Sequence, residues 1–122
     1  MDKKRILLIE DCQVAQKVAR FLFEKLECKL DLASSGAEGI SLAGEHSYSL
    51  VIVDVGLPDI SGIETVEQLL KEHREYRDEV PIVALTAHND DDYKKSCLAT
   101  GFTSYSCKPL TMDSAKQMIS LG

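Results

Sequence analysis

The sequence predicts a doubly wound α/β fold, in which helices cover both faces of a parallel β-sheet. Five short β-rich segments alternate along the 122 residues with longer amphipathic stretches. Such an alternation favours parallel strands joined by helical crossovers. Three of the strand segments are almost continuously apolar, which is typical of strands that are covered on both faces. The length suits one domain, which would take in residues 1–122.

The predicted strands differ in polarity, and the difference indicates their places in the sheet. The three apolar strands are expected at residues 6–9, 50–53 and 82–85. The segments at residues 30–33 and 103–107 carry more polar side chains. Because an edge strand is less buried than a central one, we place these two segments nearer to the edges.

The first helix is predicted by apolar side chains at three- and four-residue spacing. These side chains are Val14, Val18, Phe21, Leu22 and Leu26. Their spacing gives the helix one apolar face, and a face of this kind normally packs on the sheet.

Two later helices have clear start signals. Ser35 with Glu38, and Ser61 with Glu64, both fit the capping box S-x-x-E. In this motif the serine oxygen accepts a hydrogen bond from a free backbone amide of the first turn, and the glutamate reaches back. The second and third helices are therefore expected to begin at these serines.

The last two helices complete the alternation. A fourth helix is expected to begin near residues 89–91 and to end before Gly101, since glycine commonly follows the last helical residue. A fifth helix is expected after Pro109.

Composition and charge exclude several classes of protein. The chain has 20 acidic and 14 basic residues, a net charge of −6, whereas nucleic-acid binding needs a basic face. The first apolar run is four residues long, but a signal peptide needs ~7–15 apolar residues and a membrane span ~20. The four cysteines lack the C-x-x-C spacing of zinc and redox sites. We expect a cytoplasmic domain that contacts neither nucleic acid nor membrane, although its parent protein could be membrane-anchored.

The ends of the predicted strands carry the residues that suggest chemistry, and ligands of doubly wound sheets bind there. Four of the strands end in polar residues, namely Glu10 and Asp11, Asp54, Thr86, and Lys108. If the first and third strands are neighbours, three carboxylates converge, and their repulsion favours a hard divalent cation such as Mg²⁺. Carboxylate, metal, lysine and hydroxyl are together the parts that move a phosphoryl group.

Each of these residues also has a structural interpretation. Asp11 could cap the first helix, and Asp54 could start a turn. Thr86 could simply favour a strand, and Lys108 could be a surface lysine. The functional interpretation depends on their coincidence, because each lies at the end of a different predicted strand.

The spacing of these residues resembles that of the receiver domains of two-component response regulators. The matching segments are Glu10-Asp11, Asp54 with Leu57-Pro58 and Gly62, Ala84-Leu85-Thr86-Ala87, Tyr105 and Lys108-Pro109. The resemblance covers nearly the whole chain. It implies a flavodoxin-like sheet of strand order 2-1-3-4-5 and a phosphoacceptor that switches conformation in signal transduction.

The resemblance also implies a role for each matching residue. Asp54 is the expected phosphoacceptor. Glu10, Asp11 and the backbone carbonyl of Gly56 would join Asp54 around Mg²⁺. A domain with this set would catalyse its own phosphorylation and dephosphorylation.

Three further roles are implied around the phosphoryl group. Thr86 and Lys108 would contact it, and Tyr105 would be the aromatic partner of Thr86 in the switch. The Lys108–Pro109 bond is expected to be cis, as in relatives. Gly56 and His88 would flank the path of hydrolytic water and set the phosphoryl lifetime, although His88 could equally be a solvated loop residue.

A finer resemblance is to the receivers of hybrid histidine kinases. These often read E-D-N-x-x-N-Q-x-V-A, A-L-T-A-H and K-P-L, at positions that correspond to residues 10–19, 84–88 and 108–110. Cys12 and Ala15 replace the two asparagines. The implied partner is a histidine kinase or a histidine phosphotransfer domain in a phosphorelay, and the parent chain could itself be a kinase.

A docking surface for that partner is expected at the start of the first helix and in the loop after the fifth strand. Small or apolar groups are found there, at Cys12, Ala15, Pro109 and Leu110. Such a patch suits a weak interface with a helical phosphotransfer partner. The alternative is that Ala15 and Leu110 merely complete the local core.

Other functions remain open at this point. The chain could be a stand-alone response regulator, or a non-phosphorylated receiver that only binds protein. A flavodoxin-like cofactor binder would have a glycine-rich loop after the first strand, and none is present. A phosphatase with an aspartyl nucleophile usually has a second aspartate where this chain has Gly56.

Overall fold

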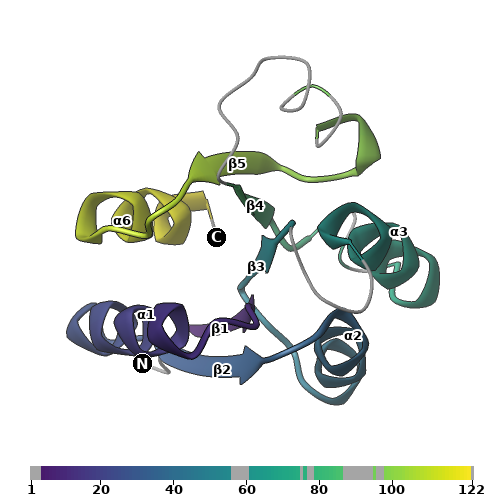
Figure 1. Ribbon diagram of the computed structural model, residues 1–122. Coiled ribbons are helices and arrows are strands. Elements are labelled where there is room, and N and C mark those ends of the chain that lie inside the picture. The colour runs from purple at the N-terminus through teal and green to yellow at the C-terminus, as the bar shows by residue number, and fades with distance from the viewer. Residues whose placement is uncertain are drawn as a thin grey trace.

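Five parallel strands form one sheet, and helices cover both of its faces (Figure 1). The computed structural model describes residues 4–55, 61–74, 76, 79–86, 95 and 98–121. The strands are β1 (Arg5–Ile9), β2 (Lys29–Ala33), β3 (Leu50–Asp54), β4 (Ile82–Thr86) and β5 (Ser104–Cys107). Their order is β2-β1-β3-β4-β5, and all neighbours pair in parallel. The predicted fold class and strand order are confirmed, and the two more polar strands are the edges.

The helices lie in two layers. The described helices are α1 (Gln13–Lys25), α2 (Gly36–Glu45), α3 (Gly62–Glu72) and α6 (Met112–Leu121). Figure 1 shows α1 and α6 on one face of the sheet and α2 and α3 on the other. Of the predicted fourth helix, Lys95 and residues 98–100 are helical, and the remainder lies outside the described residues. None of the helices in the described part of the chain is long and apolar enough to cross a membrane.

The central strands divide the core into two halves. Leu7 and Ile9 of β1 pack with residues of α2 and α3, whereas Ile6 and Leu8 pack with residues of α1 and α6. This division follows from the strand geometry, because successive side chains point to opposite faces. All four side chains are at most 1% exposed. Burial of such a side chain contributes roughly 1.5–3 kcal/mol, which explains the continuous apolar runs in the sequence.

The apolar face predicted for α1 is only partly buried. Leu22 is buried, and Leu26 packs against the core. The other three residues of that face are 71%, 43% and 59% exposed, and they are Val14, Val18 and Phe21. For these three residues the prediction of a core-facing position is wrong.

A neighbouring stripe of α1 faces the sheet instead. This stripe consists of Ala19, Leu22, Phe23 and Leu26. Its positions follow the i, i+3, i+4, i+7 spacing that a core-facing helix requires. Two overlapping stripes therefore satisfy the helical period, and the buried one places the Phe23 ring, which is 0% exposed, in the core.

The predicted helix starts are confirmed by their capping contacts. Ser35 Oγ accepts a hydrogen bond from the backbone N–H of Glu38 at 3.2 Å, and Ser61 Oγ accepts one from Glu64 at 3.1 Å. Each such cap contributes about 0.5–2 kcal/mol. Gly101 directly follows helical residues 98–100 and has a φ of +132°, which side chains rarely adopt.

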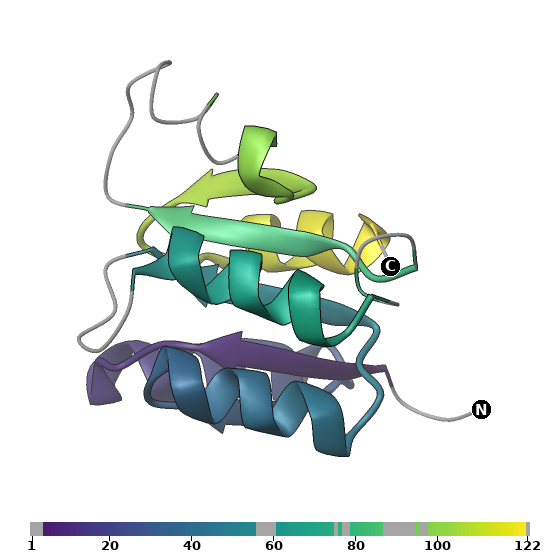
Figure 2. The ribbon, with the colours of Figure 1, turned by 90° about the vertical axis from the view of Figure 1, so that its right-hand side faces the viewer.

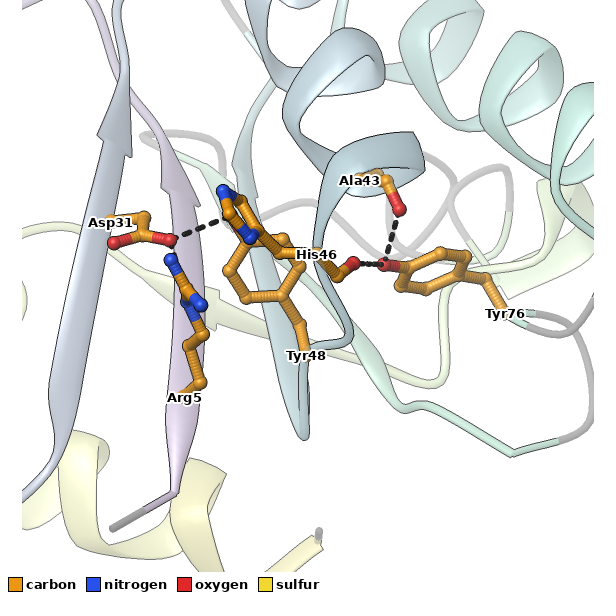
Figure 3. A network of polar contacts seen from close by, with 6 residues as sticks. All are labelled: Arg5, Asp31, Ala43, His46, Tyr48 and Tyr76. Atoms are coloured by element: carbon orange, nitrogen blue, oxygen red, sulfur yellow. Dashed lines mark hydrogen bonds and ion pairs between the residues drawn. The ribbon is translucent and has the colours of Figure 1, made fainter.

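A polar network joins the start of β1 to β2 and to the segment before β3 (Figure 3). The Asp31 carboxylate accepts hydrogen bonds from Arg5 Nε at 2.8 Å and from the Tyr48 hydroxyl at 2.7 Å. Burial by itself would raise the pKa of Asp31, but these two hydrogen bonds outweigh it and lower the pKa. Burial and the nearby carboxylate raise the pKa of Tyr48, so the phenol stays a donor.

Tyr48→Phe is expected to destabilise the protein, because it removes a hydrogen bond to a charged group, which contributes roughly 1.5–3 kcal/mol. The folded pKa of Asp31 lies below its unfolded value. This stabilisation is therefore complete above pH ~4 and is lost as the pH falls through the folded pKa. Urea unfolding of the native protein and of Tyr48→Phe, at neutral pH and at successively lower pH, measures the difference in their free energies of unfolding.

Tyr76→Phe provides the control. The Tyr76 hydroxyl donates to neutral carbonyls, of Ala43 at 2.9 Å and of His46 at 3.3 Å (Figure 3). The stability lost in this variant should not change with pH. If the cost of Tyr48→Phe also stayed constant as the pH falls, the charge of Asp31 would not be its cause.

Candidate functional site

The carboxyl ends of the strands bring the predicted acidic residues together. Figure 2 shows the arrowheads of β1, β4 and β5 pointing to the same side. Glu10 and Asp11 follow β1, and Asp54 is the last residue of β3, its neighbour in the sheet. One carboxylate oxygen from each of the three residues lies within 4.8 Å of the others. The convergence expected from the sequence is therefore present in the structure.

Two of these carboxylates are removed from solvent. Glu10 is 1% exposed and Asp54 is 3% exposed, whereas Asp11 is exposed. Burial, together with the neighbouring Asp54, raises the pKa of Glu10 against the opposing effects of Lys108 and a hydrogen bond from Cys12. That bond runs from the Cys12 backbone N–H to Glu10 Oε1 at 3.1 Å. The acidic cluster of Glu10, Asp11 and Asp54 therefore concentrates negative charge, which favours the binding of a cation.

Lys108 supplies a positive charge next to two of the three carboxylates. Its Nζ lies 3.0 Å from Asp54 Oδ1 and 3.6 Å from Glu10 Oε2. Burial alone would lower the pKa of Lys108, but the two carboxylates outweigh it and raise the pKa, so the amine is protonated. The Lys108 backbone N–H donates to the Thr86 carbonyl at 2.9 Å. The Lys108–Pro109 bond is cis, as predicted.

The remaining predicted residues differ in how far the structure places them. Thr86 is fully buried at the end of β4, which lies next to β3, the strand that ends in Asp54. Tyr105 is 36% exposed on β5, where it pairs in register with Ala84. The switch that would couple Thr86 to Tyr105 stays a prediction. Gly56 and His88 lie outside the described residues, and their expected roles also stay predictions.

An apolar cavity of about 310 Å³ lies between α1 and the segment after β5. All four residues of the expected docking surface line it, namely Cys12, Ala15, Pro109 and Leu110. Glu10 and Lys108 line it too, so the cavity adjoins the acidic cluster. Leu110 also packs against the core, so the structural alternative holds in part for this residue.

Sequence reasoning missed three residues of this region. Val14 and Val18 line the cavity, although the helical period assigned them to the core-facing stripe. Gln16 donates a hydrogen bond to the backbone carbonyl of Glu10. The signal that could have pointed to Gln16 is its place in the E-D-N-x-x-N-Q pattern, six residues after Glu10.

Comparison with known proteins decides the family of this chain. The family model described as "Response regulator receiver domain" matches residues 6–120. The chain belongs to this family. As a receiver domain it is a component of two-component signal transduction, and the resemblance inferred from the sequence is confirmed.

Among curated proteins, the receiver is 34% identical over 114 residues to the aerobic respiration control sensor protein ArcB of Escherichia coli (strain K12). The alignment covers 93% of this chain and 14% of ArcB. The chain spans less than half of the length of the first curated relatives that it matches.

Two solved receiver structures are informative about the site. The receiver domain of sensor histidine kinase PA1611 from Pseudomonas aeruginosa PAO1 has a magnesium ion coordinated in its active site cleft. It is 26% identical, with a TM-score of 0.87 over 98% of this chain and 97% of that one. The Saccharomyces cerevisiae response regulator Ssk1 has a receiver solved with the histidine phosphotransfer protein Ypd1. It is 28% identical, with a TM-score of 0.88 over 97% of this chain and 87% of that one.

Glu10→Gln is expected to stabilise the receiver in metal-free buffer at neutral pH. The folded pKa of Glu10 is raised, so its charged form costs stability once the pH is above that value. The amide keeps an oxygen for the Cys12 N–H and removes the charge. The gain should shrink as the pH falls and Glu10 becomes protonated in the native receiver. Urea unfolding with a chelator measures it.

Glu24→Gln is the matched control, because Glu24 is an exposed glutamate of α1. Its stability should stay close to that of the native receiver at every pH. If Glu10→Gln were less stable than the native receiver at neutral pH, the Glu10 carboxylate would be net stabilising, and a raised pKa of Glu10 would be contradicted.

Proposed function

We propose that this receiver takes a phosphoryl group from a phosphohistidine onto Asp54 in a Mg²⁺-dependent reaction. The observation that carries the proposal is the position of Asp54. Its carboxylate is buried, lies within reach of two further carboxylates, and has the Lys108 ammonium 3.0 Å away. A nucleophile, a cation site and a fixed positive charge are the requirements of phosphoryl transfer.

In the proposed reaction, an oxygen of the Asp54 carboxylate attacks the phosphorus of the donor phosphohistidine. The O–P bond forms as the N–P bond breaks, and the electron pair of the N–P bond returns to the ring nitrogen. A phosphohistidine that is protonated at its other ring nitrogen therefore leaves as neutral imidazole. Lys108 offsets the negative charge of the phosphoryl oxygens. The product is an acyl phosphate, which hydrolyses, so the receiver acts as a switch that resets.

The residues present fit a magnesium ion. Hard oxygen ligands suit Mg²⁺, and Glu10, Asp11 and Asp54 supply three of them within 4.8 Å. The carbonyl of Gly56 is the proposed fourth ligand. A bound Mg²⁺ would supply charge neutralisation for the incoming phosphoryl group. The magnesium ion in the PA1611 receiver supports this assignment.

Phosphorylation is proposed to shift the receiver between two conformations. Thr86 would close on the phosphoryl group, and Tyr105 would rotate into the space that Thr86 leaves. Gly56 and His88 are proposed to set how long the phosphoryl group lasts, because by resemblance to other receivers they would flank the path of water.

The proposed context is a phosphorelay in which this receiver is part of a hybrid histidine kinase. The similarity to the receiver domain of sensor histidine kinase PA1611 supports a receiver within a kinase. The similarity to the Ssk1 receiver, which was solved with the histidine phosphotransfer protein Ypd1, supports a phosphotransfer partner. A stand-alone response regulator is the alternative. The partner is proposed to be a histidine kinase or a histidine phosphotransfer domain.

The partner is proposed to dock on α1 and on the segment after β5. The apolar cavity beside Lys108 lies between these elements. Val14, Val18 and Phe21 extend the surface as exposed apolar side chains on α1. A helix that packs on this stripe would bring its phosphohistidine to the acidic cluster, in a weak interface that allows release after transfer.

The native receiver is expected to gain one phosphoryl group from acetyl phosphate in the presence of Mg²⁺, as measured by intact-mass spectrometry. Asp54→Asn should abolish the gain, and a chelator should prevent it in the native receiver because the carboxylates then repel the phosphodonor. Asp113→Asn, at an exposed position of α6, is the control and should label normally. Undiminished labelling of Asp54→Asn would overturn the assignment of the phosphoacceptor.

Ala15→Glu is expected to reduce transfer from a phosphohistidine protein at least tenfold, because it places a charge on an apolar docking surface. Labelling by acetyl phosphate should persist, since this small donor needs no docking. Ala37→Glu is the control, because Ala37 is exposed on α2, on the opposite face of the sheet. Loss with both donors would indicate fold damage, and loss with neither would place docking elsewhere.

A further inference from the structure

Gln16 links three segments next to the acidic cluster. It is half-buried on the first turn of α1, six residues after Glu10. Its side-chain Nε2 donates to the Glu10 carbonyl oxygen at 2.6 Å and to Ser34 Oγ at 3.2 Å. A primary amide nitrogen has two protons, so both donors of Gln16 are used.

The Glu10 carbonyl belongs to the peptide that joins Glu10 to Asp11. These two residues carry two of the three carboxylates in the cluster. A rotation about either bond beside this peptide, ψ of Glu10 or φ of Asp11, would displace one carboxylate relative to the other. The hydrogen bond from Gln16 opposes that rotation, because it holds the carbonyl oxygen from the side of α1.

The other groups of Glu10 are also held. Its backbone N–H donates to the Ala33 carbonyl at 2.9 Å, which extends the pairing of β1 with β2. Its carboxylate accepts from the Cys12 N–H at 3.1 Å and lies 3.6 Å from Lys108 Nζ. Gln16 supplies the contact to the carbonyl, so the whole residue is fixed by the fold.

Ser34 anchors Gln16 in turn. It lies between β2 and α2, and its backbone N–H donates to Glu38 Oε2 at 3.3 Å in the first turn of α2. The amide of Gln16 is therefore held by a residue of the segment between β2 and α2, and this segment contributes no carboxylate to the acidic cluster. A side chain fixed in this way can hold the Glu10–Asp11 peptide against the repulsion among the buried carboxylates.

We propose that Gln16 is a positioning residue that sets the affinity of the cluster for Mg²⁺ by fixing the Glu10–Asp11 peptide. The inference rests on the proposed function, because it takes this cluster as the magnesium site. Residues that orient metal ligands typically change metal affinity by 10–100-fold when they are replaced.

Gln16→Glu tests the proposal, because two explanations predict opposite results. The variant has nearly the same shape, but its carboxylate cannot donate to the Glu10 carbonyl at neutral pH. Added negative charge near the cluster would by itself tighten Mg²⁺ binding. Loss of positioning would weaken it, and we expect the Kd for Mg²⁺ to rise about tenfold. Isothermal titration calorimetry of the unphosphorylated receiver measures the Kd.

Gln13→Glu is the matched control. It makes the same change one turn earlier on the same helix, at an exposed position. Its Mg²⁺ affinity should be equal to that of the native receiver or tighter. If Gln16→Glu behaved like Gln13→Glu, the charge and not the position of the side chain would matter, and the proposal would be overturned.

Gln16→Met keeps the experiment decisive if the glutamate variant folds poorly, since it removes both donors without adding charge. It should also weaken Mg²⁺ binding, with a free energy of unfolding in chelator close to the native one. Labelling by acetyl phosphate should need about tenfold more Mg²⁺ but reach the native rate at saturation. Native affinity in Gln16→Met would refute the proposal.

These results are separable from a failure of the proposed function. If the native receiver neither bound Mg²⁺ nor accepted a phosphoryl group at Asp54, the proposed function would fail. If the native receiver did both and the Gln16 variants bound Mg²⁺ as tightly, only the positioning role would fail.

Discussion

The structure depends on holding like charges together at one edge of a parallel sheet. Glu10 and Asp54 are almost completely buried, and with Asp11 they place three carboxylate oxygens within 4.8 Å. Buried charges are costly unless they are paired. Lys108 supplies one partner, 3.0 Å from an Asp54 oxygen. The negative charge that Lys108 leaves unbalanced makes this edge receptive to a divalent cation and, through it, to a phosphoryl group.

The surrounding elements approach this edge closely. At the start of α3, a Cβ on Gly62 would lie 2.4 Å from the Cα of Val55, the residue after Asp54. The Gly62 N–H donates to the Val55 carbonyl at 3.0 Å. Only glycine allows the helix to begin this near the strand that carries Asp54, the proposed phosphoacceptor. On the other side, Gln16 of α1 contacts the backbone of Glu10.

Helix α1 serves two surfaces at the same time. Its buried stripe, which includes Phe23, fills the core against the sheet. Its exposed stripe, which includes Val14 and Val18, borders the cavity next to Lys108. Apolar side chains that the core does not use thus lie where a partner would approach the site. The incorrect assignment of these valines to the core-facing stripe and their place in the proposed docking surface both follow from their apolar side chains.

The sequence by itself predicted the order of the strands and helices and the set of residues at the proposed site. The apolar runs at residues 50–53 and 82–85, and the caps at Ser35 and Ser61, depend on neighbours in the chain, so local patterns were sufficient. The resemblance to receiver domains then pointed to Asp54 and to the residues expected around it, which include Glu10, Asp11, Thr86 and Lys108. Only the tertiary structure decided which stripe of α1 is buried, because two stripes satisfy the same helical period. It also decided the contact of Gln16 with Glu10 and Ser34, because that contact requires segments distant in sequence to pack at hydrogen-bonding distance.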